Sequence, residues 1–272
     1  AKLNIKMLTN YIKGHLTPSE NIILDIKHKN ILKISNKRND SSNKGYLITD
    51  KSDWVKGIAS YKNKIFPLKI RLKGMSTSHW EKHQPWSYKL NLKGNKTIMG
   101  MQRFAIQHPR HRGYMNEWHF HKISNYLGLI APRYKFTTLT INGKRYPIYA
   151  IEENFDKRLI ENNRKKAAPI FMLTDKRATT EYLEFFNIIS FYQKDSYGKT
   201  KEGTELMRRV ERLIKGYMSG NKKASEVFDL SLMAKAYAIT DLFGNQHSIN
   251  TGNMRFYINP HSGLIEPIPF DQ

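Results

Sequence analysis

One stretch of the sequence, YKFTTLTINGKRYPIYAIEE, constrains the fold more than any other segment of the chain. In it, two runs rich in β-branched and aromatic residues flank Asn142 and Gly143. This dipeptide tolerates the positive φ angles of a tight two-residue turn better than most other pairs. The stretch therefore predicts a β-hairpin.

Turn residues divide the rest of the first half of the chain into short segments. Strands are expected at residues 21–27, 66–74 and 87–94, because apolar and polar residues alternate there between Gly, Asn and Ser turns. One helix is expected at residues 114–128, because apolar residues recur there at helical spacing and Gly128 ends the run.

After Glu153 the pattern becomes helical, over residues 155–163, 179–194, 203–218 and 229–244. Asp229 is placed to cap the start of the last of these helices, and Gly244 is placed to cap its end. A terminal hairpin is expected from residues 254–259 and 264–269. We therefore expect an α+β, two-lobed molecule, with a β-rich N-terminal lobe at residues 1–153 and a mainly helical C-terminal lobe at residues 154–272.

The charge of the chain indicates what kind of partner it attracts. There are 46 Lys and Arg residues against 23 Asp and Glu residues, which gives a formal net charge of +23 at pH 7. Such a surface favours phosphates, nucleic acids and acidic glycans. The absence of cysteine excludes disulfides, thiolate metal sites and a cysteine nucleophile. No apolar run approaches the roughly 18 residues that a membrane span needs. Because the sequence starts at Ala1 rather than at Met, we expect a processed or trimmed product.

Basic residues around one expected strand pair could bind phosphates. A strand carrying Arg71 and Lys73 runs into Gly74 and a Ser/Thr-rich loop, and the next strand returns with Lys89. Backbone N–H groups and a lysine ammonium in such a loop can hold phosphate oxygens. The alternative is that Lys89 is simply an exposed strand residue.

A second basic segment precedes the helix expected at residues 114–128. Its cationic side chains are Arg103, His108, Arg110, His111 and Arg112. The N-terminus of a helix favours anions, so a contact with phosphate or an acidic ligand is one interpretation. A solvated basic loop is the other.

The end of the chain could hold a metal ion. A polar loop with Asp241, Asn245, His247, Asn250 and Asn253 follows the last helix, and Asp271 follows the terminal hairpin. In kinases, a loop supplies a base and a metal-binding Asn, and the end of the next hairpin supplies an Asp that binds magnesium. Asn253 and Asp271 offer the oxygen ligands that magnesium prefers. The alternative is a polar turn after a buried strand.

Several motifs together resemble those of the CotH kinase family. They are RLKGMS, SYKLNLKG, GMQRFAIQHP, NEW, LGLIAPRYKFTTLTINGKRYPIYAIEENFDKRLIEN and NMRFYINPHSGLIEPIPFD. The resemblance runs from about Ile65 to Asp271. It implies a two-lobed, atypical protein-kinase-like fold that binds ATP with Mg²⁺ or Mn²⁺. Some family members phosphorylate Ser or Thr in proteins.

The resemblance also implies roles for single residues. Lys89 is similar to the phosphate-binding lysine of the family, Glu153 to its glutamate after the hairpin, Asn253 to its loop asparagine and Asp271 to its metal-binding aspartate. Where active members tend to carry an Asp as the base, this chain has His247 nearby.

Two side chains can be considered for the catalytic base. A neutral imidazole at His247 can accept a hydroxyl proton near pH 7. Asp241 is the alternative base, and it lies on the preceding helix.

Three functions follow from these observations. The first is a phosphotransferase that uses ATP and a divalent metal and acts on a protein or an envelope polymer. The second is a catalytically inactive kinase-fold protein that binds nucleotide or an acidic polysaccharide through its basic surface. The third is a nucleic-acid-binding protein, for which the sequence has no recognised motif. The resemblance further implies a bacterial, exported or envelope-associated protein whose leader is absent from this chain.

Overall fold

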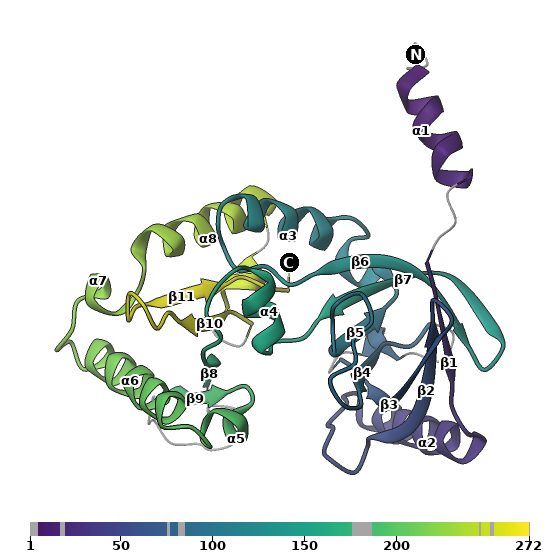
Figure 1. Ribbon diagram of the computed structural model, residues 1–272, viewed down its shortest axis with the longest axis horizontal. Helices are drawn as coiled ribbons and strands as arrows, with labels where there is room; N and C mark the ends of the chain where they lie inside the picture. The colour runs from purple at the N-terminus through teal and green to yellow at the C-terminus, as the bar shows by residue number, and fades with distance from the viewer. Residues whose placement is uncertain are drawn as a thin grey trace. The chain divides into compact units, whose positions relative to one another are not determined.

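Figure 1 shows the computed structural model, in which seven strands close into a barrel and four others form a second sheet. The structure describes residues 5–16, 20–74, 77–80, 85–175, 187–244, 246–250 and 253–271. The chain divides into two compact units. Unit 1 comprises residues 1–96, 106–108 and 136–150, and unit 2 comprises residues 97–105, 109–135 and 151–272.

Helices and strands are interspersed along the described residues. The first are α1 (Ile5–Leu16), β1 (Asn21–Asp25), α2 (His28–Lys44), β2 (Val55–Tyr61), β3 (Lys64–Leu72), η1 (Thr77–His79) and β4 (Tyr88–Leu92). Next come β5 (Arg103–Gln107), η2 (Pro109–Arg112), α3 (Asn116–Tyr126), β6 (Tyr134–Ile141), β7 (Lys144–Glu153) and α4 (Lys157–Asn162). The last are β8 (Ile170–Asp175), β9 (Asn187–Phe191), α5 (Lys194–Tyr197), α6 (Lys201–Met218), α7 (Ala224–Val227), α8 (Leu230–Phe243), η4 (Gln246–Ile249), β10 (Arg255–Ile258) and β11 (Ile265–Ile268). No helix within the described ranges has both the length and the apolar character to cross a bilayer.

The barrel closes because β1 has a partner on each side. Its strand order is β1-β2-β3-β4-β5-β7-β6, and β1 pairs antiparallel with β2 and parallel with β6. Alternate residues of β3 and β4, such as Leu68, Ile70 and Leu90, are fully buried, while the residues between them are more exposed. This alternation places one face of each strand in the core and the other face outside.

The predicted hairpin between β6 and β7 is confirmed. Asn142 and Gly143 have φ angles of 46° and 82°, as a tight turn of this type requires. Asn142 also has a second role: its Oδ1 accepts from the backbone N–H of Ile26 at 2.8 Å, and its Nδ2 donates to the Ile26 carbonyl at 2.8 Å. The tip of the hairpin is thereby joined to the chain just after β1.

A second sheet, of order β11-β10-β8-β9, forms the centre of unit 2. Its strands pair antiparallel, and the terminal hairpin of β10 and β11 is as predicted. Apolar side chains of the sheet pack with those of α6, including Val210 and Ile214, in one buried cluster. A smaller cluster joins α3 to α8 through Phe120 and Ile239. The caps of α8 are also as predicted: Asp229 Oδ1 accepts from Leu232 N at 3.0 Å, and Gly244 has a φ of 65°.

The expected two-lobed kinase fold, with a β-rich N-terminal lobe and a helical C-terminal lobe, is wrong. The first strands close into a barrel, and the C-terminal part contains a four-stranded sheet as well as helices. Part of the error lies in the helix expected at residues 179–194, because residues 187–191 form strand β9. Residues 179–186 lie outside the described ranges. A short apolar run does not distinguish a buried strand from a helix by its periodicity.

The two hydrogen bonds of Asn142 lead to a stability prediction. Asn142→Ala should lower the free energy of unfolding by about 2–3 kcal/mol, because it removes two hydrogen bonds and places a Cβ-bearing residue without a polar side chain at positive φ. Asn142→Gly should cost less, about 1–2 kcal/mol, because glycine accepts the φ angle. Urea denaturation of the three proteins would measure both values. If Asn142→Gly were as stable as the wild type, the contact with Ile26 would contribute nothing.

Candidate functional site

Phe270 and Asp271, the last described residues, are held in place by aromatic and cationic contacts in unit 2. After β11, the ring of Phe270 packs edge-on against Phe155, with ring centroids 5.0 Å apart. The guanidinium groups of Arg112 and Arg255 each lie over the Phe270 ring, 5.6 Å from its centroid. These contacts determine where the next residue, Asp271, projects its carboxylate.

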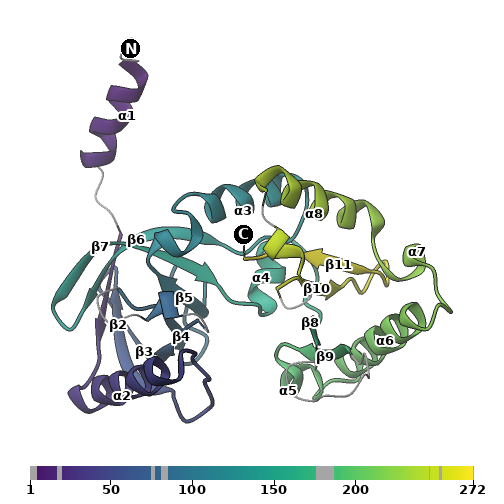
Figure 2. The same cartoon turned by 180° about the vertical axis from the view of Figure 1, so that it is seen from behind.

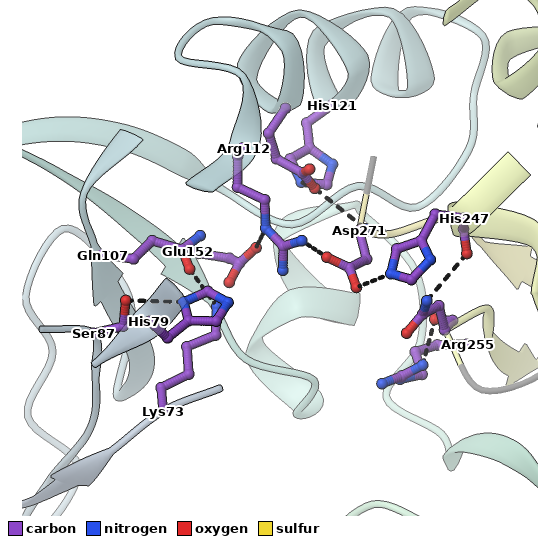
Figure 3. A network of polar contacts seen from close by, with 12 residues as sticks. Lys73, His79, Ser87, Gln107, Arg112, His121, Glu152, His247, Arg255 and Asp271 are labelled. Atoms are coloured by element: carbon purple, nitrogen blue, oxygen red, sulfur yellow. Dashed lines mark hydrogen bonds and ion pairs between the residues drawn. The ribbon is translucent and has the colours of Figure 1, made fainter. Parts of the chain in front are cut away.

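Residues of three elements contact Asp271, and Figure 3 shows two of them, Arg112 and His247, at its carboxylate. Arg112, at the end of η2, forms an ion pair with Oδ1 of the carboxylate. His247 on η4 places its Nε2 3.2 Å from Oδ2. The backbone N–H of Asp271 donates to Glu117 Oε1 on α3 at 3.3 Å. The Asp271 side chain is only 14% exposed, so its charge is compensated mainly by Arg112 rather than by solvent.

His247 is the exposed member of this group. Its side chain is 56% exposed, although one face contacts Asp271. The short helix η4 is attached to α8 by a hydrogen bond, because the buried Ser248 Oγ lies 2.8 Å from Thr240 Oγ1. Asn253 Nδ2 also donates to the His247 carbonyl at 3.2 Å. The ring is therefore accessible to a ligand while its backbone is held.

Buried acidic residues extend the site away from solvent. On α3, His121 Nε2 lies 2.9 Å from Glu117 Oε1, and both side chains are almost fully buried. On β7, the buried Glu152 places Oε1 4.0 Å from Arg112 Nε, on the other side of the guanidinium from Asp271 (Figure 3). Neither Glu117 nor Glu152 was predicted to have a functional role from the sequence. Their only sequence signals were the NEW motif and the position of Glu152 directly before Glu153.

Arg112 belongs to the basic segment that was interpreted as a ligand contact or a solvated loop. In the structure its side chain is only 12% exposed and it pairs with carboxylates of the protein. Arg112 is therefore not simply solvated, and the anions it contacts in the structure are carboxylates of the protein rather than of a ligand.

Among the described residues, Asn253 is linked to Asp271 through His247, whereas Asp241 is not. Asn253 is half-buried, and its amide contacts the backbone of His247, whose ring contacts Asp271. Asp241 lies exposed in the last turn of α8, and no ion pair or side-chain hydrogen bond joins it to Asp271 within the described residues. Asn245 lies outside those residues.

Asp271 and Asn253 provide oxygen donors, which are the kind of ligand that magnesium prefers. The described part of the chain has no group of three or more His, Asp and Glu side chains arranged around one point for a metal. A magnesium ion beside a nucleotide needs fewer protein ligands. It commonly takes one or two protein oxygens and completes its coordination shell with water and phosphate. The Asp271 carboxylate and the Asn253 amide oxygen are ligands of that kind, and both residues contact His247.

In unit 1, two of the expected phosphate-binding residues are neighbours across a strand pair. Arg71 on β3 lies directly opposite Lys89 on β4. The Arg71 guanidinium stacks over Trp54, 5.0 Å from the ring centroid. Burial lowers the pKa of Arg71, and the charges of Asp53 and Asp50 oppose that shift. The group nevertheless remains a cation at neutral pH.

Lys73, also in unit 1, lies beside a buried amide. Its Nζ donates to Gln107 Oε1 at 2.9 Å, and the residue is only 9% exposed (Figure 3). The Nε2 of Gln107 is buried and has no hydrogen-bond acceptor among the described residues. A lysine ammonium and an unsatisfied N–H donor therefore lie side by side, which is an arrangement that an anion can satisfy.

The turn after Lys73 requires glycine. Gly74 has a φ of +93°, and a Cβ at this position would lie 2.3 Å from ring atoms of His79. The His79 ring contacts Ser87 Oγ through Nδ1 at 3.0 Å, and the Trp80 indole donates to the Gly74 carbonyl at 3.0 Å. The start of the loop is thus packed tightly against its end.

Glu153, expected at the cofactor site, is paired with Arg133 in unit 2. The carboxylate accepts from the Arg133 guanidinium at both oxygens and from the Arg133 backbone N–H at 3.1 Å. Burial raises the pKa of the Glu153 carboxyl, and the hydrogen bonds from Arg133 offset part of that rise. Its assignment to the cofactor site stays a prediction.

The comparison with known proteins agrees with the motifs. A family model described as CotH kinase protein matches residues 70–272, which is most of the chain. No curated protein matches the chain.

The pairing of Glu153 with Arg133 gives a prediction with a defined pH dependence. Arg133→Met leaves a buried carboxylate without its counter-charge and should lower stability by about 3–5 kcal/mol at neutral pH. The pKa of the Glu153 carboxyl is higher in the folded protein than in the unfolded chain, where it is near 4.5. The protonated carboxyl therefore contributes its full stabilisation when the pH is below 4.5, and this contribution is lost as the pH rises through the pKa of the folded state. The variant should therefore lose stability, relative to the wild type, as the pH rises from about 4 to about 7.

The double variant Arg133→Met with Glu153→Gln is the matched control, because it removes the stranded charge. It should recover part of the loss and show little of the pH dependence. Urea denaturation at several pH values would measure all three proteins. A loss in Arg133→Met that did not change with pH would contradict this account of the pair.

Proposed function

The chain belongs to the CotH kinase protein family, and we propose that it is a phosphotransferase that uses ATP and a divalent metal ion. The acceptor in this proposal is a hydroxyl group of a protein or of an envelope polymer. The observation that carries the proposal is the environment of Asp271, where Arg112, His247 and Glu117 meet one poorly exposed residue. Such a concentration of charged groups with an accessible imidazole suits phosphoryl transfer, which depends on positioning and electrostatic stabilisation.

Asp271 and Asn253 would hold the metal ion. A bound Mg²⁺ neutralises charge on the transferring phosphate groups. The Asp271 carboxylate is already aimed and neutralised by Arg112, so the protein side of this site is ordered before any ligand arrives. Arg112 is also a candidate for contact with phosphate, since a guanidinium binds phosphate and carboxylate with similar geometry.

His247 would take the proton from the acceptor hydroxyl. Because the Asp271 carboxylate can only accept a hydrogen bond, the contact at 3.2 Å favours the ring tautomer with the proton on Nε2. In the neutral ring the lone pair is then on Nδ1, which is the atom that would accept the proton. Asp271 would therefore both orient and electrostatically support the base, as a carboxylate does for a catalytic histidine in other enzymes.

The cations of unit 1 would bind the nucleotide phosphates. Lys73 with the amide N–H of Gln107 offers one pair of donors, and the cross-strand neighbours Arg71 and Lys89 offer another. Gln107 was not among the residues expected from the sequence. It enters the proposal because its buried donor has no acceptor among the described residues.

Binding of ATP can be measured by calorimetric titration with and without Mg²⁺. We expect binding that strengthens with the metal, and Lys89→Ala should weaken it by about tenfold or more with little change in melting temperature. Lys64→Ala is the matched control, because Lys64 is an exposed lysine at the start of β3. Equal affinity in the wild type and in Lys89→Ala would remove Lys89 from the site.

Turnover separates the metal ligand from the base. Asp271→Asn keeps the size of the side chain but removes its charge, and it should abolish metal-dependent phosphate transfer while the protein stays folded. His247→Ala should lower turnover by about 10²–10⁴-fold and leave the binding of metal and ATP largely intact. Gln246→Ala, on the same short helix and also exposed, should leave turnover unchanged.

Two outcomes would overturn parts of this proposal. If Asp271→Asn bound metal and ATP as well as the wild type, Asp271 would be a structural residue of the turn. If the wild type bound metal and ATP but transferred no phosphate to any acceptor or to water, the chain would be a nucleotide-binding protein and not an enzyme.

A further inference from the structure

Unit 1 has a groove that the proposed phosphotransfer does not use. Its volume is about 870 Å³, and it is lined by β1, the start of α2, β2, β3 and the turn at Asn142. Specific ligand pockets have volumes of roughly 300–1,000 Å³, so this groove has the size of a binding site. Figures 1 and 2 show α2 beside β2 and β3, with which it is in contact.

The walls of the groove are held together by hydrogen bonds. Asn30 Nδ2 on α2 donates to the Lys56 carbonyl on β2 at 2.7 Å. Asn142 joins its side chain to both backbone groups of Ile26, each at 2.8 Å. Helix, barrel and hairpin turn are thereby tied together, and the groove is preformed.

The rim of the groove is strongly basic. Among the described residues that line it there are five lysines and one acidic residue, Asp25; the lysines are Lys27, Lys29, Lys33, Lys56 and Lys93. Lys33 donates to the Ser52 carbonyl at 2.7 Å. Among the described residues, no ion pair joins Lys27, Lys29, Lys56 or Lys93 to a carboxylate. The field in the groove therefore favours an anion.

Two lysines on the strands beside the groove repel each other, and a bound anion would reduce this repulsion. Lys56 on β2 lies directly opposite Lys69 on β3, and both side chains are exposed. Like charges directly opposite each other destabilise a sheet. The first turn of α2 adds to this field, since it has no acidic residue and its N-cap residue, Lys27, makes no side-chain capping bond.

The floor of the groove, in contrast, is apolar. Ile26, Val55 and Leu68 are buried there, while Trp54 is partly exposed and Ile58 is 44% exposed. A sugar polymer or an inorganic anion would satisfy the lysines but would leave these apolar side chains in contact with water. A ligand that matches both parts must carry carboxylates and apolar groups together.

We propose that this groove binds an acidic peptide segment of a partner protein, in which carboxylate side chains alternate with apolar ones. The carboxylates would contact Lys29, Lys56 and the neighbouring lysines, and the apolar side chains would cover Ile58 and Trp54. This site is a docking surface with its own ligand, and it does not rest on the proposed phosphotransferase activity.

The test uses the full chain and a fluorescein-labelled ten-residue peptide in which glutamate and leucine alternate. Fluorescence anisotropy should show binding that weakens as salt is added, because the contacts are partly ionic. The double variant Lys29→Glu with Lys56→Glu should weaken binding about tenfold or more. Lys64→Glu with Lys199→Glu makes the same change in net charge at exposed lysines that do not line the groove, and it should keep the affinity within about twofold.

A third variant tests the apolar floor. Ile58→Ser should weaken binding of the glutamate–leucine peptide and leave unchanged the binding of an all-glutamate peptide of the same length. Circular dichroism melting curves would confirm that each variant is folded. If the Lys29 and Lys56 pair unfolded, Lys27→Gln with Lys93→Gln would replace it, and if Ile58→Ser unfolded, the β-branched Ile58→Thr would replace it.

Three results would overturn the proposal: no binding of the peptide, equal weakening by the groove pair and the control pair, or an all-glutamate peptide or heparin bound as tightly as the glutamate–leucine peptide. The last two would show general charge attraction. Since no nucleotide is present, failure here leaves the phosphotransferase proposal untouched, and failure of phosphate transfer leaves this one untouched.

Discussion

The barrel depends on the double pairing of β1. This short strand joins β2 on one side and β6 on the other, so that residues 21–24 pair with residues 138–141. Without this contact the first strands would form an open sheet with two free edges. Within this barrel Arg71 faces Lys89 and Lys56 faces Lys69. It also brings Asn142 to the end of β1, where its side chain satisfies both backbone groups of Ile26. The basic groove is lined in part by β1, β2 and the turn at Asn142, which this closure brings together.

In unit 2 the corresponding constraint is the compensation of poorly exposed charge. Asp271, Glu117 and Glu152 are carboxylates with little access to water, and such groups are costly unless cations or donors surround them. Arg112 lies between Glu152 and Asp271, and Glu117 contacts both His121 and the backbone of Asp271. His247 is the member of this network with most of its side chain open to solvent. A network of this kind holds its members in position before a ligand binds, which is the condition for electrostatic catalysis.

For several candidate residues the sequence predicted the position relative to the nearest strands and turns, while their assignment to a functional site stays a prediction. Asp271 was expected to follow a hairpin, and β10 and β11 do form one. Arg71 and Lys89 were expected on paired strands, and the register of β3 and β4 places them directly opposite each other, while Lys73 follows the end of β3. Glu117, Glu152 and Gln107 received no role, because each matters through a partner that is distant in the sequence: Glu117 through Asp271, Glu152 through Arg112, and Gln107 through Lys73. Asp241, in contrast, has a suitable side chain but lies exposed on α8, and no ion pair or hydrogen bond joins it to Asp271 in the described part of the chain.

The sequence by itself determined the features that depend on a few neighbouring residues. These are the turn at Asn142 and Gly143, the caps of α8 at Asp229 and Gly244, the terminal hairpin, the excess of positive charge and the motifs of the family. Only the tertiary structure decided that β1 closes a barrel with β6, that residues 187–191 form a strand, and that Arg112 neutralises Asp271. The physical reason is the range of the forces involved. Backbone torsion preferences and capping bonds act within one turn of the chain, whereas strand pairing and the compensation of buried charge join residues that only packing brings together.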